Sequence, residues 1–235
     1  MRDTGAVVSA PPLLVASTDA GGFYCEHAHF AHVDAARRRG LSVDRVGFLH
    51  VPDDEPTWGR PGPRPFESTL AMVDRMVKLL LPDGGRLLLT GFAPWGLVVD
   101  NPSGAFVASP RALAALAESD APIPRGRALV AKGRRIEIVS AVLPVTDEAL
   151  DPSSKTAIPS LHDTFHPDAV LALGVVADGD TSERIYRVEL CATNRNLRIR
   201  SGCWVHTADA PATVIQPTRG LRAAVSSWPS PMTTT

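Results

Sequence analysis

The sequence lacks an excess of charge of either sign, and it lacks a long apolar run. Its 24 Lys and Arg residues nearly balance its 25 Asp and Glu residues. This balance argues against the broad basic face with which proteins bind nucleic acid or anionic membranes. No apolar run approaches the roughly 18 residues that a membrane-spanning helix needs. We therefore expect a small polar partner, with no nucleic acid and no membrane.

Cysteine is also scarce, with only Cys25, Cys191 and Cys203 among 235 residues. An odd number without regular spacing argues against a disulfide framework and favours a reducing compartment. The N-terminal stretch carries Asp3 and two prolines before a short apolar run, unlike the basic start and continuous apolar core of a signal peptide. These features predict a soluble cytoplasmic protein.

Short apolar stretches alternate with segments of helical periodicity along the chain. We predict strands at 12–18, 44–52, 86–92, 167–175 and 183–194, a hairpin at 126–145, and helices at 26–39, 68–82, 110–119, 147–166 (broken) and 217–228. Ser68 is the expected cap of the second helix. This order predicts a single α/β domain over 1–235, with a mostly parallel, mixed and twisted sheet, helices on both faces and a disordered tail at 229–235.

In such sheets, functional sites lie at the carboxyl ends of the strands. The residues that follow or end the predicted strands should therefore meet at one edge of the sheet. They include a cysteine, a histidine and several aromatic residues: Phe23, Tyr24, Cys25, His50, Phe92, Trp95 and Val175.

The stretch GGFYCEHAH (21–29) allows three interpretations of Cys25. It could be a nucleophile at the start of a helix, with His50 as its base and a third group to orient the imidazole. It could instead share one helical face with His29 and His32 and bind zinc. It could also be a small buried residue beside surface histidines, since cysteine is often buried and inert. Spacing alone leaves all three open.

Four stretches resemble segments of one enzyme family. LLLTGFAPWGLVVDNPS (87–103) is similar to the T-G-F-x-P-F-G and N-P-S segments of pyroglutamyl peptidase I, also called pyrrolidone-carboxylate peptidase. STDAGGFYCEHAHF (17–30) and GFLHVP (47–52) resemble its nucleophile segment T-A-G-T-F-V-C-N and its G-F-I-H-V-P strand. ELCATN (189–194) resembles the E-R-V-A-I-N stretch that carries the family's glutamate.

The order of these segments differs from the family's order. In the family the T-G-F loop comes first, then the glutamate, then the cysteine and histidine, whereas here the cysteine and histidine come first. The resemblance therefore implies a circular permutation, in which 1–82 corresponds to the family's C-terminal part and 86–228 to its N-terminal part. LLLPDGGRLLLT, with its two-glycine turn, would join the two parts. Permutation is tolerated when the natural ends lie close together at the surface.

The resemblance implies a cysteine peptidase that removes N-terminal pyroglutamate from a small peptide whose N-terminus is blocked. Cys25 would attack the carbonyl carbon, His50 would transfer the proton, and Glu189 would orient the imidazole. Backbone N–H groups at the start of the helix would bind the oxyanion, an interaction worth roughly 3 kcal/mol per donor in other enzymes. No metal and no cofactor is needed. Family members often associate, so a homo-oligomer is an open alternative.

The resemblance also implies a ring pocket lined by Phe23, Phe92 and Trp95, the last in place of a phenylalanine. Val175 stands where the family has a glutamine, and an unpaired lactam group there would cost roughly 1–3 kcal/mol. The alternative function is therefore a catalytically altered relative that binds or hydrolyses a different small amide or lactam.

Two alignments in the last part of the chain remain open. One places Tyr186 instead of Glu189 at the acid's position, although Glu189 matches the family's glutamate segment better. The other compares LRIRSG (197–202) with the family's A-R-I-P-D-N segment, which makes Arg198 a candidate neighbour of the active site.

Overall fold

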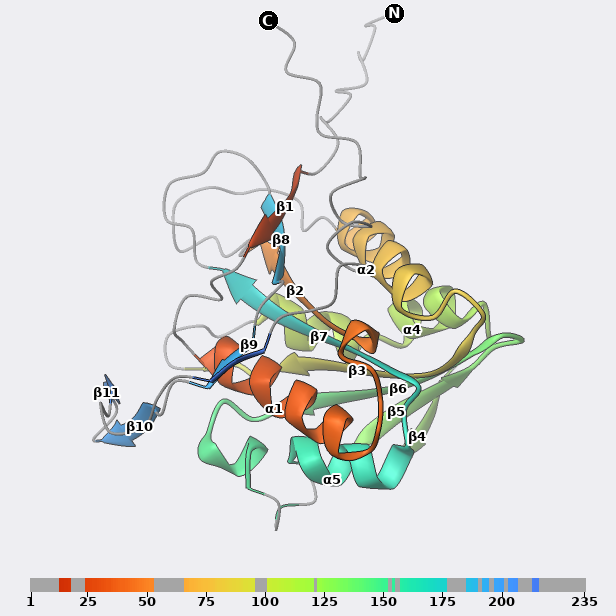
Figure 1. Ribbon diagram of the computed structural model, residues 1–235. Helices are drawn as coiled ribbons and strands as arrows, with labels where there is room; N and C mark the ends of the chain where they lie inside the picture. The colour runs from red at the N-terminus through yellow and green to blue at the C-terminus, as the bar shows by residue number, and fades with distance from the viewer. Residues whose placement is uncertain are drawn as a thin grey trace, which may run out of the picture.

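A computed structural model gives the fold of the chain (Figure 1). It describes 13–17, 24–52, 66–95, 101–120, 122–151, 154, 157–176, 185–189, 192–194, 197–200, 203–206 and 213–215. In 13–17 and in the strands after 191, only the backbone is described. The predicted helix at 217–228 and the tail at 229–235 lie outside these ranges.

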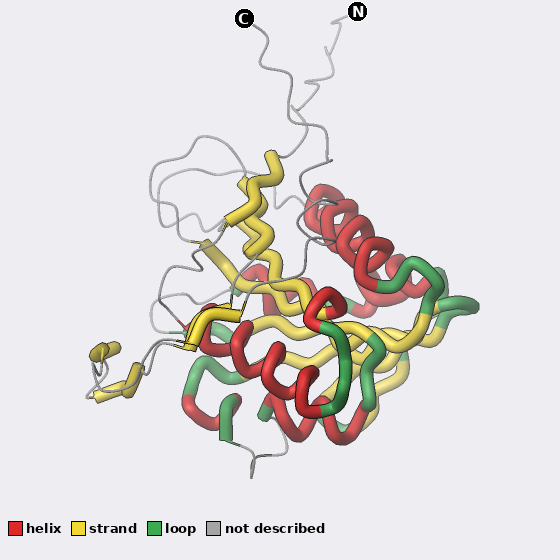
Figure 2. The backbone as a smooth tube through the Cα atoms, in the orientation of Figure 1, coloured by secondary structure: helices red, strands yellow, loops and turns green. Residues whose placement is uncertain are grey.

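An eight-stranded sheet forms the centre of the described fold (Figure 2). Its strands are β1 (Leu13–Ser17), β2 (Val46–Pro52), β3 (Gly85–Phe92), β4 (Ile123–Arg125), β5 (Ala128–Lys132), β6 (Ile136–Leu143), β7 (Ala169–Val176) and β8 (Ile185–Glu189). They lie in the order β1-β8-β2-β7-β3-β6-β5-β4. The pairs β2–β7, β7–β3 and β3–β6 are parallel, and β1–β8 is parallel too, whereas β8–β2, β6–β5 and β5–β4 are antiparallel.

Two small antiparallel ribbons accompany the sheet. One pairs β9 (Ala192–Asn194) with β12 (Thr213–Ile215), and the other pairs β10 (Leu197–Arg200) with β11 (Cys203–His206).

Helices cover both faces of the sheet, as the alternating pattern predicts. On one face lie α1 (Tyr24–Arg38) and α5 (Ile158–Phe165), and on the other lie α2 (Phe66–Leu80), α3 (Pro102–Val107) and α4 (Pro110–Ala117) (Figure 1). Short 3₁₀ helices, Val43–Arg45 and Asp147–Ala149, precede β2 and follow β6. No helix among the described residues is long and apolar enough to cross a membrane.

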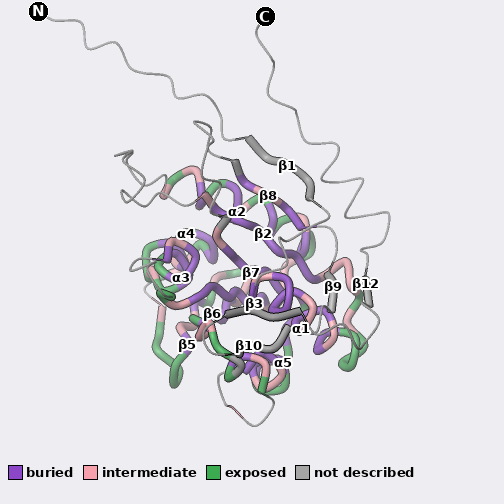
Figure 3. Tube along the Cα trace, turned by 90° about the vertical axis from the view of Figure 1, so that its left-hand side faces the viewer, coloured by how far each residue is buried: buried purple, intermediate pink, exposed green. Residues whose placement is uncertain are grey.

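The central strands are buried on both faces, which explains their continuous apolar runs (Figure 3). Successive side chains point to opposite faces. Phe48 therefore belongs to the core under α1 and α5, and Leu49 belongs to the core under α2 and α4. Six of the seven residues of β2 are buried, and only Pro52 at its end is half-buried.

A tight two-glycine turn joins α2 to β3. Gly84 and Gly85 have φ angles of +86° and +132°, which a residue with a side chain adopts only with strain. The Gly84 N–H donates to the Leu81 carbonyl, and the Gly85 N–H donates to the carbonyl of Arg135. The DGG turn predicted from the sequence is confirmed.

The predicted α/β class and mixed sheet are confirmed, and several details need correction. The helix predicted at 68–82 begins at Phe66, so Ser68 lies inside it and does not cap it. The hairpin β5–β6 is present, but an additional edge strand, β4, precedes it. The turn-forming residues of APWGLVVDNPSG (93–104) predict a loop, yet this segment contains the start of α3, which Asn101 caps. The strand predicted at 183–194 is two strands, because β8 ends at Glu189 and β9 pairs with β12.

Candidate active site

Three neighbouring strands place their side chains in one row on the face covered by α1. Phe48 lies opposite Glu189 in the β2–β8 pair, and His50 lies opposite Gly174 in the β2–β7 pair. Phe48 and His50 are two residues apart, so their side chains share a face. The row therefore holds a carboxylate, an aromatic ring, an imidazole and a glycine near the carboxyl ends of β8, β2 and β7.

His50 and Glu189 form a buried hydrogen-bonded pair. The Nδ1 atom of His50 lies 2.7 Å from Oε1 of Glu189, and the two side chains are 3% and 1% exposed. A carboxylate accepts hydrogen bonds only, so Nδ1 carries the proton and donates it to Glu189. This tautomer leaves Nε2, the other ring nitrogen, to face a second partner.

That second partner is Cys25, the second residue of α1. The half-buried Cys25 side chain hydrogen-bonds to His50, and its sulfur lies beside Gly174. The partial positive charge at the start of a helix stabilises a thiolate. Cysteine, histidine and glutamate are therefore linked in that order.

The pKa of His50 is raised to about 9 from the usual value near 6.5. Burial of the ring acts in the opposite direction, because it disfavours the charged imidazolium. Hydrogen bonds to Cys25 and Glu189, together with their negative charge, outweigh that effect. At neutral pH, His50 is therefore protonated and can donate a proton from Nε2.

The second carboxylate oxygen of Glu189, Oε2, is buried and accepts no hydrogen bond from the described residues. Leaving such an oxygen unpaired costs roughly 1–3 kcal/mol. The ion pair with protonated His50 offsets this cost. Unpaired buried polar groups are rare in folded proteins, and they concentrate where function requires them.

The residue before Cys25 anchors the start of α1. The hydroxyl of Tyr24 donates to the backbone carbonyl of Thr146 at 2.7 Å, and its ring meets Phe92 edge-on at 5.5 Å between centroids. Tyr24 therefore ties the start of α1, where Cys25 lies, to the loop after β6 and to the end of β3. Sequence reasoning placed Tyr24 at this edge but gave it no role.

The N-P-S segment holds the end of β3 in place. Asn101 caps α3 by accepting from the Ser103 N–H, and its Nδ2 donates to the Ala93 carbonyl. The Ser103 hydroxyl accepts from the backbone N–H of Phe92 and donates to Asn101. The two halves of the sequence TGF…NPS are therefore one hydrogen-bonded unit, which positions Phe92 against Tyr24.

The residues predicted to line a ring pocket do not all lie beside Cys25. Phe92 is buried on the same face as His50, whereas Trp95 is 50% exposed. The Val175 side chain packs against the core on the α2 side of the sheet, because it pairs with Val51 rather than with His50. Its position does not support the expectation that it lines the site. Phe23 lies outside the described residues, as does the side chain of Arg198 in β10.

Tyr186, the alternative to Glu189 in the sequence alignment, lies on the other face. Its ring is fully buried in the core under α2, and its hydroxyl lies 3.0 Å from that of Thr69. The geometry therefore favours Glu189 as the partner of His50.

The histidines near Cys25 have separate partners. Nδ1 of His32 lies 3.1 Å from Nε2 of His162. The other ring nitrogen of His32, Nε2, lies 3.0 Å from the hydroxyl of Thr90. His29 packs against the Phe48 ring at 5.3 Å between centroids. Within the described residues, no three His, Cys, Asp or Glu side chains are grouped so that they could hold a metal ion. The zinc interpretation of Cys25, His29 and His32 thus has no support in this geometry.

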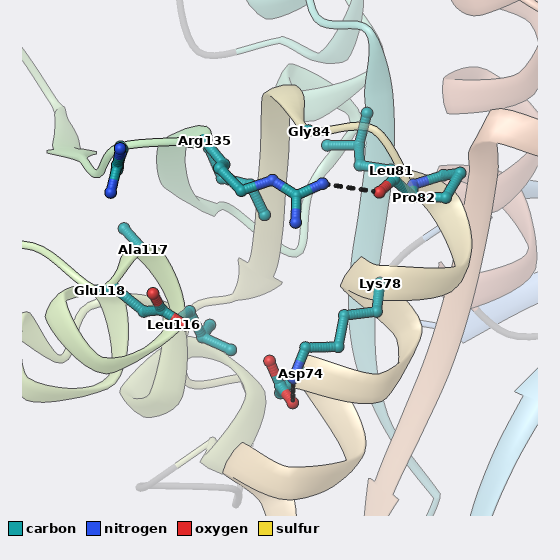
Figure 4. Close-up of a pocket in the computed structure, with 11 residues that line it drawn as sticks. Asp74, Lys78, Leu81, Pro82, Gly84, Leu116, Ala117, Glu118 and Arg135 are labelled. Atoms are coloured by element: carbon teal, nitrogen blue, oxygen red, sulfur yellow. Dashed lines mark hydrogen bonds and ion pairs between the residues drawn. The ribbon is translucent and has the colours of Figure 1, made fainter.

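A cavity of about 100 Å³ lies at the opposite end of the sheet, where β3 and β6 begin (Figure 4). Of the charged side chains that line it, Lys78 is paired with Asp74 at 2.7 Å and Arg135 donates to the Pro82 carbonyl. It contains neither Cys25 nor His50, so we do not place the chemistry there.

Comparison of the chain with family models, curated proteins and solved structures gave no match.

Proposed function

We propose that this protein is a cysteine peptidase that removes N-terminal pyroglutamate, with a circularly permuted version of the pyroglutamyl peptidase I fold. One observation carries the proposal. Cys25, His50 and Glu189 come from three separate segments that resemble that family, and they are linked through the 2.7 Å bond between His50 and Glu189 and the bond between Cys25 and His50. If the three resemblances were due to chance, there would be no reason for these side chains to lie together in the folded chain.

In the proposed acylation step, the Cys25 thiolate attacks the carbonyl carbon of the pyroglutamyl residue. The C–N bond to the next residue breaks, and protonated His50 gives its Nε2 proton to the leaving amine. Glu189 holds the other ring proton at Nδ1 and keeps the imidazole in this orientation. The product is a pyroglutamyl thioester on Cys25.

Water completes the proposed cycle. Neutral His50 takes a proton from water, the resulting hydroxide attacks the thioester carbonyl, and the C–S bond breaks. Pyroglutamate leaves, and the Cys25 thiolate and protonated His50 are restored. Cys25 lies in the first turn of α1, and the starts of helices in general supply backbone N–H donors to an oxyanion, so this turn would bind the oxyanion in both steps.

The tight connection between α2 and β3 supports the permuted order. In the family, the segment like 66–80 would end the chain and the segment like 85–92 would begin it. Here Gly84 and Gly85 join them within four residues. Such a short link requires the two ends to be adjacent in space, which is the condition for permutation.

Hydrolysis of a fluorogenic amide of L-pyroglutamate tests the proposal. We expect the wild-type protein to release the fluorophore and Cys25→Ser to release none above background. Cys203→Ser is the matched control, and we expect it to retain activity. Absence of hydrolysis by a folded wild-type protein would contradict the proposal.

A second candidate is a relative that acts on a different small amide or lactam. Val175 favours it, because an apolar side chain turned toward the α2 core cannot supply the amide group that the family's glutamine provides. In that case the protein would not cleave pyroglutamyl amides, but it would hydrolyse other N-acyl amides in a way that depends on Cys25. A panel of fluorogenic amides with different acyl groups separates the two candidates.

A further inference from the structure

Gly174 lies directly beneath the proposed nucleophile. It is opposite His50 in the β2–β7 register, and its missing side chain points to the face covered by α1. A Cβ atom built there would lie 2.9 Å from the sulfur of Cys25 and 2.8 Å from Cε1 and Cζ of Phe48. These separations are shorter than van der Waals contact, so alanine fits only if a neighbour moves.

The two neighbours differ in their freedom to move. The Phe48 ring is fully buried and packs against the rings of His50 at 5.0 Å and His29 at 5.3 Å between centroids. Cys25 is half-buried and has one side-chain torsion, so its sulfur can turn toward the surface. The easiest relief is therefore rotation of the sulfur away from His50.

We infer that Gly174 is a positioning residue, which holds the Cys25 sulfur beside His50 by having no side chain of its own. The inference rests on the proposed role of Cys25 as nucleophile. It concerns how the reacting pair is assembled and not how the substrate is recognised.

The test is the rate at which iodoacetamide alkylates Cys25 in Gly174→Ala, measured on the peptide that contains Cys25. The thiolate is the reactive form, and a neighbouring imidazolium in general favours the thiolate, so alkylation reports how close the sulfur lies to His50. We expect alkylation near pH 6 to be at least about 10-fold slower in the variant, because a thiol without a cationic neighbour ionises only at about pH 8.5. Near pH 9 the two rates should converge. If the ratio of the variant's rate to the wild-type rate were the same near pH 6 and near pH 9, the inference would be overturned.

Gly47→Ala is the matched control. Gly47 is in β2, and the three atoms nearest to a Cβ atom there would be flexible ends of side chains, those of Met76 and Leu80 at 3.1 Å and of Leu171 at 3.3 Å. It reports the general effect of alanine in this sheet, so we expect wild-type alkylation at both pH values. Slow alkylation near pH 6 in Gly47→Ala as well would assign the effect to the sheet and would overturn the role of Gly174.

A second variant settles the matter if Gly174→Ala does not fold. Phe48→Leu with Gly174→Ala removes the ring atoms, so the new methyl group meets the sulfur alone. We expect this double variant to react slowly near pH 6 and Phe48→Leu alone to react quickly; equal rates would overturn the inference. Alkylation needs no substrate, so failure of the wild-type protein to cleave pyroglutamyl amides would contradict the proposed function and leave this comparison intact.

Discussion

The Nδ1 atom of His50 lies 2.7 Å from Oε1 of Glu189, in a position where both side chains are almost fully removed from solvent. A buried carboxylate and imidazole stabilise each other only as a pair, because either charge alone would be costly in this environment. The pair fixes the tautomer of His50 and directs Nε2 toward Cys25. Its consequences can be measured on the protein without knowledge of the substrate.

Glu189→Gln should lower the pKa of His50 from about 9, because the glutamine retains a hydrogen-bond acceptor but removes the negative charge. Titration of the His50 ring by NMR measures this directly. We expect amide hydrolysis to fall roughly 10³-fold or more, as when a triad carboxylate is neutralised.

Glu67→Gln is the control for Glu189→Gln. Glu67 forms an exposed surface pair with Arg111, so its loss should change neither the His50 titration nor the activity. An unchanged His50 titration in Glu189→Gln would contradict the assigned pair.

Activity should decline as the pH rises through about 9, because in the proposed mechanism His50 must be protonated to donate to the leaving amine. The profile of kcat/KM against pH in the free enzyme reports this pKa. Between neutrality and about pH 8, a full unit below this pKa, we expect a loss of no more than about a tenth. A decline that begins near 6.5, the usual histidine value, would show that Cys25 and Glu189 do not raise the pKa of His50.

The buried pair of His32 and His162 should destabilise the fold in acid. Burial, and then the charge of Arg39, lower the pKa of His162 to about 4, although Asp163 opposes this. Burial and the neighbouring His162 and His29 lower the pKa of His32 well below its usual range. Between about pH 6.5 and 4 the unfolded chain therefore binds more protons than the folded chain, so the free energy of unfolding falls as the pH falls. For His162 the loss is roughly 3 kcal/mol.

His162→Gln tests this acid sensitivity, because it removes the titrating group and keeps a hydrogen-bonding side chain for His32. Urea unfolding from about pH 7 to 4 should show a smaller dependence on pH than in the wild-type protein. His166→Asn is the control, since His166 is exposed and Asn tolerates its left-handed backbone conformation. The same pH dependence in His162→Gln and the wild type would rule out His162 as a source of the effect.

Asn101→Ala should cost more stability than the loss of an ordinary helix cap. Ser109 caps α4 through a single bond to Ala112 N–H, and its replacement by alanine should cost about 1 kcal/mol. Asn101 caps α3 and also contacts the Ala93 carbonyl and the Ser103 hydroxyl, so we expect roughly 2–3 kcal/mol. Equal losses in urea unfolding would mean that the N-P-S segment is only a cap.

The sequence predicts the layers of this fold well, because its strands are continuous apolar runs and its helices have apolar faces. It predicts the boundaries less well. Phe66 begins α2 although Ser68 is the better cap in the sequence, and α3 is hidden in a segment rich in turn-forming residues. The exposed edge strand β4 contains Pro124, and none of its residues is buried. Its sequence therefore lacks the alternation of apolar and polar residues from which a strand is predicted.

The side chains of the proposed active site could be predicted from resemblance, but their surroundings could not. Cys25, His50 and Glu189 lie in recognisable segments. Val175 was misplaced because only the strand register shows that it faces α2, while the preceding residue, Gly174, faces α1. The glycine after the apolar run AVLAL (169–173) was the available signal. The reason for a glycine at this position is its contact with Cys25, which is about 150 residues away in the chain. The sequence alone does not show that contact.

The most direct test of the central claim is to trap the acyl-enzyme. The wild-type protein is mixed with a pyroglutamyl ester or amide, quenched in acid during turnover, digested and analysed by mass spectrometry. We predict one pyroglutamyl group on the peptide that contains Cys25, and none when Cys25 is replaced by alanine. Product release without an adduct on that peptide, or an adduct that persists in Cys25→Ala, would contradict the assignment of Cys25 as the nucleophile.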